Sequence, residues 1–137
     1  NAIRRLSLER NVFLLGSFSR EYLVELYNYS DIVCIPSVPT NLWQEQYGYS
    51  LVEAMACGKP IVSTLSGAIP YNVIDQKSGF LVSPGEYKQL SFALQQLVEN
   101  PNLRKKIGKY NRNRIIKEFN AEKKAKQLSK IYRDVMV

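Results

Sequence analysis

The stretch "GYSLVEAMACGKPIVST", residues 48–64, carries the clearest signals for the fold. Residues 48–57 predict a helix, and Gly58 is its C-terminal stop. Pro60 then opens a run of apolar and β-branched residues that is typical of a buried strand. A helix that passes directly into a buried strand indicates an α/β protein.

The same alternation extends on both sides of this stretch. Short apolar runs predict four strands, at residues 11–16, 31–36, 60–64 and 79–82. Helical patterns follow Ser19, span 48–57, occur near 70–74 and fill most of 86–137. Buried strands that alternate with helices form a parallel sheet covered on both faces. We therefore predict an α/β fold with a Rossmann-like parallel sheet and a helical C-terminal tail.

Composition is that of a soluble globular protein, with 45% apolar and 23% charged residues. No apolar run reaches the roughly 18 residues of a membrane-spanning helix, and the first residues lack the apolar core of a signal peptide, so we expect a cytoplasmic protein. Cys34 and Cys57 lack the spacing of a metal site, and we expect both to be buried thiols. Because histidine is absent, we predict no metal site, and chemistry would use carboxylates, backbone amides or hydroxyls.

The positive charge is concentrated near the C-terminus. Residues 100–137 contain twelve Lys or Arg against three Asp or Glu, whereas residues 1–99 contain seven against nine. A solvated helical face explains this charge, and the alternative is a peripheral contact with the anionic inner face of a membrane. A nucleic-acid surface fits less well, because the apolar and aromatic residues of the segment are spaced for burial rather than for base stacking.

Parallel sheets bind ligands at the carboxyl ends of their strands, which here selects the loops after Gly16, Pro36 and Thr64. The middle loop leads to a predicted helix start at residues 48–50. The backbone N–H groups of Gly48, Tyr49 and Ser50 would be unpaired within that helix and would suit a phosphate. Gly48 has no Cβ to block a close approach.

Two glutamates, Glu45 and Glu53, flank this helix start eight positions apart. If the stretch between them were helical throughout, they would lie on nearly one side about 12 Å apart, roughly the extent of a diphosphate with a sugar at each end. Glu45 also fits an exposed loop acid or a charge that stabilises the helix. Glu53 lies among apolar residues, and a buried carboxylate needs hydrogen-bond donors such as ribose hydroxyls.

Residues 11–119 resemble the C-terminal, nucleotide-sugar-binding half of the group 1, or family 4, retaining glycosyltransferases of the GT-B fold. The shared features are the E-x7-E pattern, "EAMACGKPIV", the "SG" loop and the "GFLVSPG" turn, in the order and at the spacing of that family. The resemblance implies an enzyme, in the full-length protein, that transfers a sugar from a nucleoside-diphosphate sugar to an acceptor with retention of configuration. Such enzymes serve polysaccharide or glycolipid biosynthesis.

The resemblance also implies roles for individual residues. Glu45 would contact the donor sugar and stabilise positive charge at its anomeric carbon, and Glu53 would bind the ribose hydroxyls. The amides of Tyr49 and Ser50, beside Gly48, would hold the diphosphate leaving group. The turn from Gly16 to Phe18 would meet the base through backbone groups. This catalysis relies on fixed dipoles, so no metal or cofactor is implied.

The chain departs from the family at one loop. Ser66 replaces the first glycine before Gly67, and Tyr71 replaces a glutamate, so a loop amide near the sugar or phosphates could be placed differently and a carboxylate is lost. These departures bear on activity and donor choice. They leave open a module that binds a nucleotide sugar or a partner without catalysis, and, as a weaker alternative, a sugar-nucleotide epimerase.

The chain is expected to be a piece of a larger protein. The acceptor-binding N-terminal domain and the first strands of the nucleotide-binding domain, with their Arg/Lys pair, are absent from residues 1–137. A doubly wound domain normally has about six strands, whereas four are predicted here. We therefore expect the strand at residues 11–16 to be an uncovered apolar edge, which invites self-association.

Overall fold

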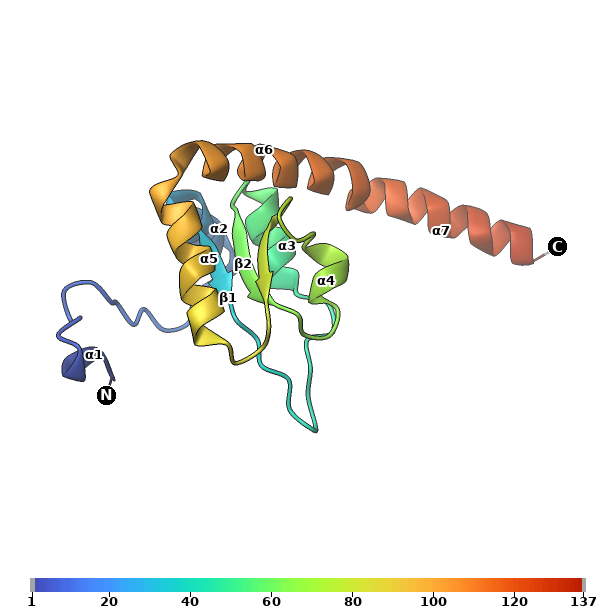
Figure 1. Ribbon diagram of the computed structural model, residues 1–137. Coiled ribbons are helices and arrows are strands. Elements are labelled where there is room, and N and C mark those ends of the chain that lie inside the picture. The colour runs from blue at the N-terminus through green and yellow to red at the C-terminus, as the bar shows by residue number, and fades with distance from the viewer. Residues whose placement is uncertain (1, 137) are drawn as a thin grey trace.

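The computed structural model describes residues 2–136. Helices and strands alternate along them (Figure 1), in the order α1 (Ala2–Arg5), α2 (Arg20–Tyr29), β1 (Val33–Ile35), α3 (Tyr49–Ala56), β2 (Ile61–Thr64), α4 (Ile69–Asn72), β3 (Gly79–Val82), α5 (Tyr87–Glu99), α6 (Pro101–Glu118) and α7 (Ala121–Val135). The α/β class predicted from the sequence is confirmed.

The strands form a parallel sheet in the order β1-β2-β3, within the described part of the chain. Val33 pairs with Ile61, and Ile61 pairs with Gly79. All four residues of the central strand β2 are buried, as its apolar run predicts. Three of the four predicted strands are therefore present, with parallel pairing.

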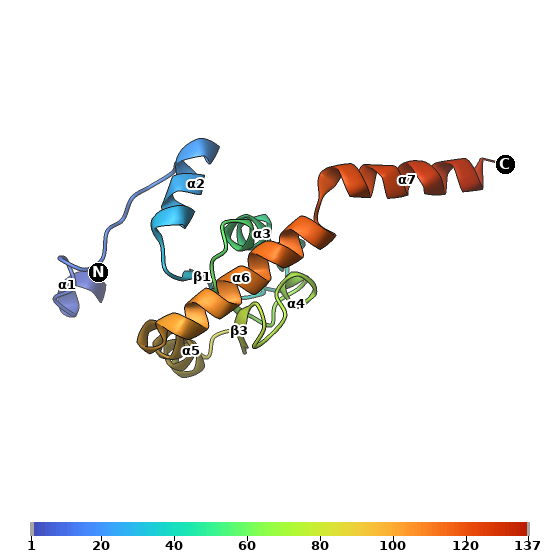
Figure 2. The same cartoon turned by 90° about the horizontal axis from the view of Figure 1, so that it is seen from above.

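The fourth prediction, a strand at residues 11–16, is wrong. Residues 12–19 have no regular secondary structure, and Leu14 is 81% exposed. In Figures 1 and 2 this segment runs away from the sheet toward α1. A strand is held by hydrogen bonds to a neighbouring strand, and within residues 2–136 no strand lies beside this segment. Its apolar composition is not sufficient to make it a strand.

Two apolar clusters lie on the two faces of the sheet. Successive residues of β2 point to opposite faces, so Ile61 belongs to one cluster and Val62 to the other. The Ile61 cluster includes Leu51 and Met55 of α3, and the Val62 cluster includes residues of α5 and α6. The predicted cover of helices on both faces is confirmed.

Helix α6 crosses the amino ends of the strands, and α7 continues away from the body (Figure 2). Asn111 of α6 is fully buried, and its Nδ2 donates to the carbonyls of Lys59 and Ser78, just before β2 and β3, at 2.8 Å each. Every residue of α7 is described, and none of them is buried. The body of the protein thus ends with α6.

The two cysteines differ in exposure. Cys34 is exposed and Cys57 is half-buried. The prediction of buried thiols is therefore wrong for Cys34, which lies on β1 at the edge of the sheet.

Within residues 2–136, no helix combines the length and the apolar character needed to cross a membrane.

Candidate functional site

The candidate site lies at the carboxyl edge of the parallel sheet. Strand β1 ends at Ile35 and β2 at Thr64, so the loops that follow them start at the same edge. The Ser63 hydroxyl donates to the Ile35 carbonyl, and the Thr64 hydroxyl donates to the Ser37 carbonyl. These bonds fix the start of the loop that carries Glu45.

Glu45 is held by its side chain and by its backbone. Its Oε1 accepts hydrogen bonds from the N–H of Gly48 at 2.9 Å and of Tyr47 at 3.4 Å. Its carbonyl accepts the N–H of Ala68 at 2.8 Å. The loop after β1 and the loop after β2 are therefore joined at Glu45, which is half-buried.

The loop at Ser66 and Gly67 packs directly on Glu45. Gly67 has a φ of +51°, and a Cβ at this position would overlap the Glu45 carbonyl oxygen. Ser66 is 1% exposed, and its Oγ has no hydrogen-bond partner within residues 2–136. Tyr71, which is expected from the resemblance to replace a glutamate, is exposed to solvent. The predicted sugar or phosphate loop thus adjoins the predicted catalytic glutamate.

Helix α3 begins at Tyr49, with Gly48 as its N-cap in the left-handed conformation, φ 74°. The N–H groups of Tyr49 and Ser50 lie in the first turn, where a helix offers no acceptor for them, and they carry the positive end of its dipole. The prediction that the Gly48 N–H is unpaired is wrong, because it donates to Glu45. Two amides, rather than three, remain available for an anion.

Glu53 lies on α3 one turn beyond this start. Its side chain is 31% exposed and forms an ion pair with Arg20, with Nη2 and Oε1 3.4 Å apart. Glu53 is therefore less buried than its apolar neighbours in the sequence suggest. Residues 45–48 are not helical, so the arrangement predicted from one continuous helix does not apply, and the two glutamates flank the start of α3 instead.

A cavity of about 250 Å³ opens beside Glu53 between α2, α3 and α6. Its other lining residues are Arg20, Leu23, Val24, Tyr27, Ala56, Cys57 and Arg112. Burial raises the pKa of the Tyr27 phenol, and the Ser50 side chain partly opposes this rise. Burial also raises the pKa of the Cys57 thiol, so the thiol form is favoured.

The turn from Gly16 to Phe18 is linked to this region through α2. Gly16 has a φ of +78°, and the Phe18 ring stacks on Tyr22 with centroids 5.1 Å apart. Ser19 caps α2, as predicted, by accepting the N–H of Tyr22. The turn is exposed and does not follow a strand in the described structure.

Two residues of this region were not identified from the sequence. The Asn72 Nδ2 donates to the Tyr47 carbonyl in the Glu45 loop. The Arg114 guanidinium donates to the carbonyls of Asn72 and Tyr71. The only sequence signal for Asn72 is a polar residue in the otherwise apolar segment "IPYNVI". Arg114 is one of seven Lys or Arg residues in α6, and nothing in the sequence distinguishes it from the others.

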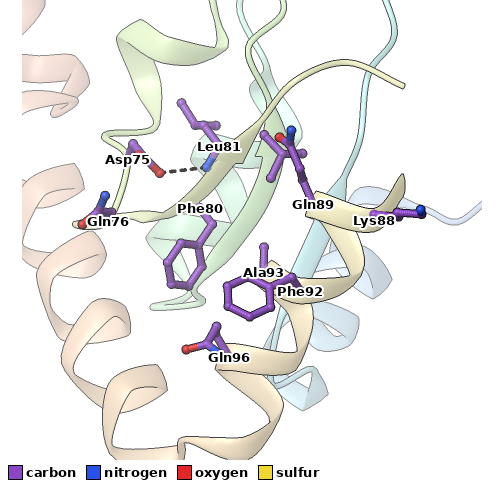
Figure 3. A pocket seen from close by; sticks show the side chains of 10 residues that line it. Asp75, Gln76, Phe80, Leu81, Lys88, Gln89, Phe92, Ala93 and Gln96 are labelled. Atoms are coloured by element: carbon purple, nitrogen blue, oxygen red, sulfur yellow. Dashed lines mark hydrogen bonds between the residues drawn. The ribbon is translucent and has the colours of Figure 1, made fainter. Parts of the chain in front are cut away.

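A larger cavity, of about 410 Å³, lies between β3 and α5 (Figure 3). Phe80 and Phe92 line it, with Gln96 beside them. The Asp75 carboxylate accepts the N–H of Leu81 at 2.9 Å at its rim. Because this cavity is mostly apolar and both glutamates lie elsewhere, it is not the candidate site.

The chain is similar to known glycosyltransferases in sequence. The family described as glycosyl transferases group 1 matches residues 1–114. A D-inositol 3-phosphate glycosyltransferase of Corynebacterium jeikeium (strain K411) is 35% identical over 130 residues, which are 95% of this chain and 30% of that protein. The chain thus spans about a third of the length of the curated relatives it matches.

Solved structures show the same likeness in three dimensions. Sucrose-phosphate synthase of Thermosynechococcus elongatus has a TM-score of 0.86 and 30% identity, over 98% of this chain and 33% of that one. Anabaena Alr3699/HepE, solved in complex with UDP, has a TM-score of 0.86 and 28% identity, over 96% of this chain and 35% of that one. The same protein was solved with UDP-glucose.

Proposed function

Because the chain belongs to the glycosyl transferases group 1 family, we propose that it is the nucleotide-sugar-binding part of a retaining glycosyltransferase. It has the α/β fold of the C-terminal domain of GT-B enzymes. The proposed enzyme transfers a sugar from a nucleoside-diphosphate sugar to an acceptor. The observation that carries the proposal is the junction of the Glu45 loop, the Gly67 loop and the start of α3 at one sheet edge.

The diphosphate of the donor binds at the start of α3. The free N–H groups of Tyr49 and Ser50 and the helix dipole favour a negative charge there. When the bond from the anomeric carbon to the diphosphate oxygen breaks, its electron pair stays on the diphosphate, and fixed backbone dipoles stabilise this leaving group. Transfer without a metal ion is part of the proposal.

Glu45 acts on the sugar. Its Oε1 is occupied by the Gly48 N–H, so the carboxylate has a fixed orientation and its other oxygen can face the sugar. Its negative charge stabilises the positive charge that develops at the anomeric carbon.

Glu53 accepts the ribose hydroxyls, and the turn from Gly16 to Phe18 meets the base. The ion pair of Glu53 with Arg20 joins α3 to α2, the helix that follows this turn. The amino end of α2 therefore links the turn that is proposed to meet the base with the glutamate that is proposed to bind the ribose.

UDP and UDP-glucose are the first ligands to test, because Anabaena Alr3699/HepE was solved with both. Calorimetry on the full-length gene product should detect UDP binding, and incubation with UDP-glucose and candidate acceptors should yield a glycoside. NMR of the product should show the anomeric configuration of the donor. Failure to bind any nucleoside diphosphate would overturn the proposal.

The exposed Tyr71 favours a second candidate, a module that binds nucleotide sugars without transferring them. Binding of a donor without turnover, for every donor and acceptor tried, would support it. A product of inverted anomeric configuration would still show a glycosyltransferase, but it would exclude the retaining mechanism.

We also propose that the protein is cytoplasmic and that its helix α7 contacts an anionic membrane surface. Its exposed apolar residues share one side of the helix, at Leu128, Ile131, Tyr132 and Val135. Four of the five basic residues of α7 fall on the opposite side at the helical spacing, at Lys123, Lys126, Lys130 and Arg133, and Lys124 falls on the apolar side. An amphipathic helix of this kind can lie in the interface of an anionic bilayer.

We also propose that the chain associates with itself. The surface responsible is not the edge strand predicted from the sequence, because that strand does not form. The apolar residues of the segment 12–15 are exposed as an extended chain rather than as a sheet edge. Exposed apolar side chains of this kind favour burial against another surface.

A further inference from the structure

We propose that Asn72 and Arg114 are positioning residues that hold Glu45 in its working orientation. This inference rests on the proposed role of Glu45 at the donor sugar. It is carried by a chain of hydrogen bonds that runs from α6 through α4 into the Glu45 loop. The two bonds join residues 25 and 42 positions apart in the sequence.

The first link joins α4 to the Glu45 loop. Asn72, the last residue of α4, is 5% exposed, and its Nδ2 donates to the Tyr47 carbonyl. Tyr47 lies between Glu45 and Gly48, and the Gly48 N–H binds the Glu45 carboxylate. The Asn72 amide therefore fixes the turn that orients this carboxylate.

The second link joins α6 to α4. Arg114 donates through Nη1 to the Asn72 carbonyl and through Nη2 to the Tyr71 carbonyl, the latter at 3.2 Å. Its Nε pairs with Glu118 at 2.9 Å, and its guanidinium lies 5.3 Å from the centre of the Phe119 ring. With contacts to four residues and a side chain that is 10% exposed, Arg114 has little freedom to move.

Helix α4 needs this support because it is only four residues long. Such a short helix is not stable by itself, and its last carbonyls have no donors within the helix. Arg114 supplies these donors. Loss of either link would let the Tyr47 turn relax, and a misplacement of about 1 Å at a reacting group can lower the rate about a hundredfold.

The test compares two buried asparagines in the full-length gene product. Asn72→Leu removes the donor to the Tyr47 carbonyl. Asn111→Leu, the matched control, removes the donor to Lys59 and Ser78 at the opposite end of the sheet. Both substitutions should lower Tm. At a temperature where both variants are folded, Asn72→Leu should lower kcat about tenfold or more and leave the Kd of the nucleoside diphosphate within about twofold.

Arg114 gives a second measurement that does not depend on the folding of Asn72→Leu. Arg114→Lys keeps one donor and should recover part of the kcat that Arg114→Leu loses. The inference is wrong if Asn72→Leu keeps the wild-type kcat, if Asn111→Leu lowers kcat equally, or if Arg114→Lys and Arg114→Leu are indistinguishable. A wild-type protein that neither binds nor transfers would instead reject the proposed function itself.

Discussion

Gly67 lies directly against the backbone of Glu45, so close that a Cβ on Gly67 would overlap the Glu45 carbonyl oxygen. The next residue, Ala68, donates its N–H to the same carbonyl at 2.8 Å. A loop that follows β2 thereby sets the position of a glutamate that follows β1. Because the two loops are in contact through backbone atoms, neither can move without the other.

Because of this contact, we expect Gly67→Ala to lower the free energy of unfolding more than a glycine-to-alanine change at a position without such a contact. The matched control is Gly58→Ala, because Gly58 also has a positive φ, +70°, but a Cβ there meets only ordinary contacts. The strained conformation should lower the free energy of unfolding by about 1 to 2 kcal/mol in both variants. The overlap should lower it by about 1 to 3 kcal/mol more in Gly67→Ala.

Chemical denaturation measures both free energies, and initial rates measure turnover. Only Gly67→Ala should also lose turnover, since Gly58 lies at the amino end of β2, away from Glu45. Equal stability and equal turnover in the two variants would show that the contact with Glu45 is unimportant.

Glu53→Gln should weaken binding of the nucleoside diphosphate at least about tenfold. Hydrogen bonds to a charged acceptor contribute roughly 1.5 to 3 kcal/mol each, and 1.4 kcal/mol corresponds to a tenfold change in Kd. Isothermal calorimetry measures this change. Glu118→Gln, which alters a carboxylate on α6 paired with Arg114, should bind normally and serves as the control. Wild-type affinity in Glu53→Gln would exclude the ribose role.

Glu45→Gln should leave the affinity for the nucleoside diphosphate nearly unchanged and lower kcat. A glutamine oxygen can still accept the Gly48 N–H, so the loop should keep its shape while the negative charge is lost. The lost interaction strengthens only as the glycosidic bond breaks, which places the effect on turnover. Paired calorimetry and initial rates separate the two quantities. Full turnover in this variant would contradict the assigned role.

Ile131→Asn should weaken binding of the full-length gene product to vesicles that contain acidic lipid. Ile131 of α7 is 56% exposed, and Ile116 of α6, at 57%, provides a control of equal exposure. Binding should require acidic lipid and fall steeply between low and physiological salt, because it depends on basic residues. If neutral vesicles bind equally well, or none bind, the basic charges of the tail form only a solvated face.

Phe13→Ser combined with Leu14→Ser should reduce self-association of the 137-residue chain. Both side chains are exposed in a segment without regular secondary structure, so the change should leave the core intact. Analytical ultracentrifugation over a range of concentrations measures the effect, and circular dichroism checks the fold. A wild-type chain that stays monomeric at high concentration would remove the basis of this prediction.

Short sequence patterns correctly predict the helix and strand ends that depend on neighbouring residues. Gly58 and Pro60 correctly predict the end of α3 and the start of β2, because stopping a helix and opening a strand depend on neighbouring residues. The strand predicted at residues 11–16 fails because a strand needs a partner, which no local pattern specifies.

In the candidate site, too, the sequence predicts local features but not contacts between distant residues. The E-x7-E spacing correctly places Glu45 and Glu53 around the start of α3. The bond from Gly48 to Glu45 and the ion pair of Glu53 with Arg20 depend on how loops and helices meet in space. Asn72 is recognisable only from its contact with Tyr47, 25 residues away.

The buried Asn111 has a consequence for the order in which the protein forms. Its side chain binds the residues that precede β2 and β3, 52 and 33 positions earlier in the chain. Contacts between residues so distant in sequence slow folding, because a long loop must close first. During synthesis the strands emerge from the ribosome well before residue 111. Until α6 follows, the amino ends of the nascent sheet remain open to chaperones and to neighbouring chains.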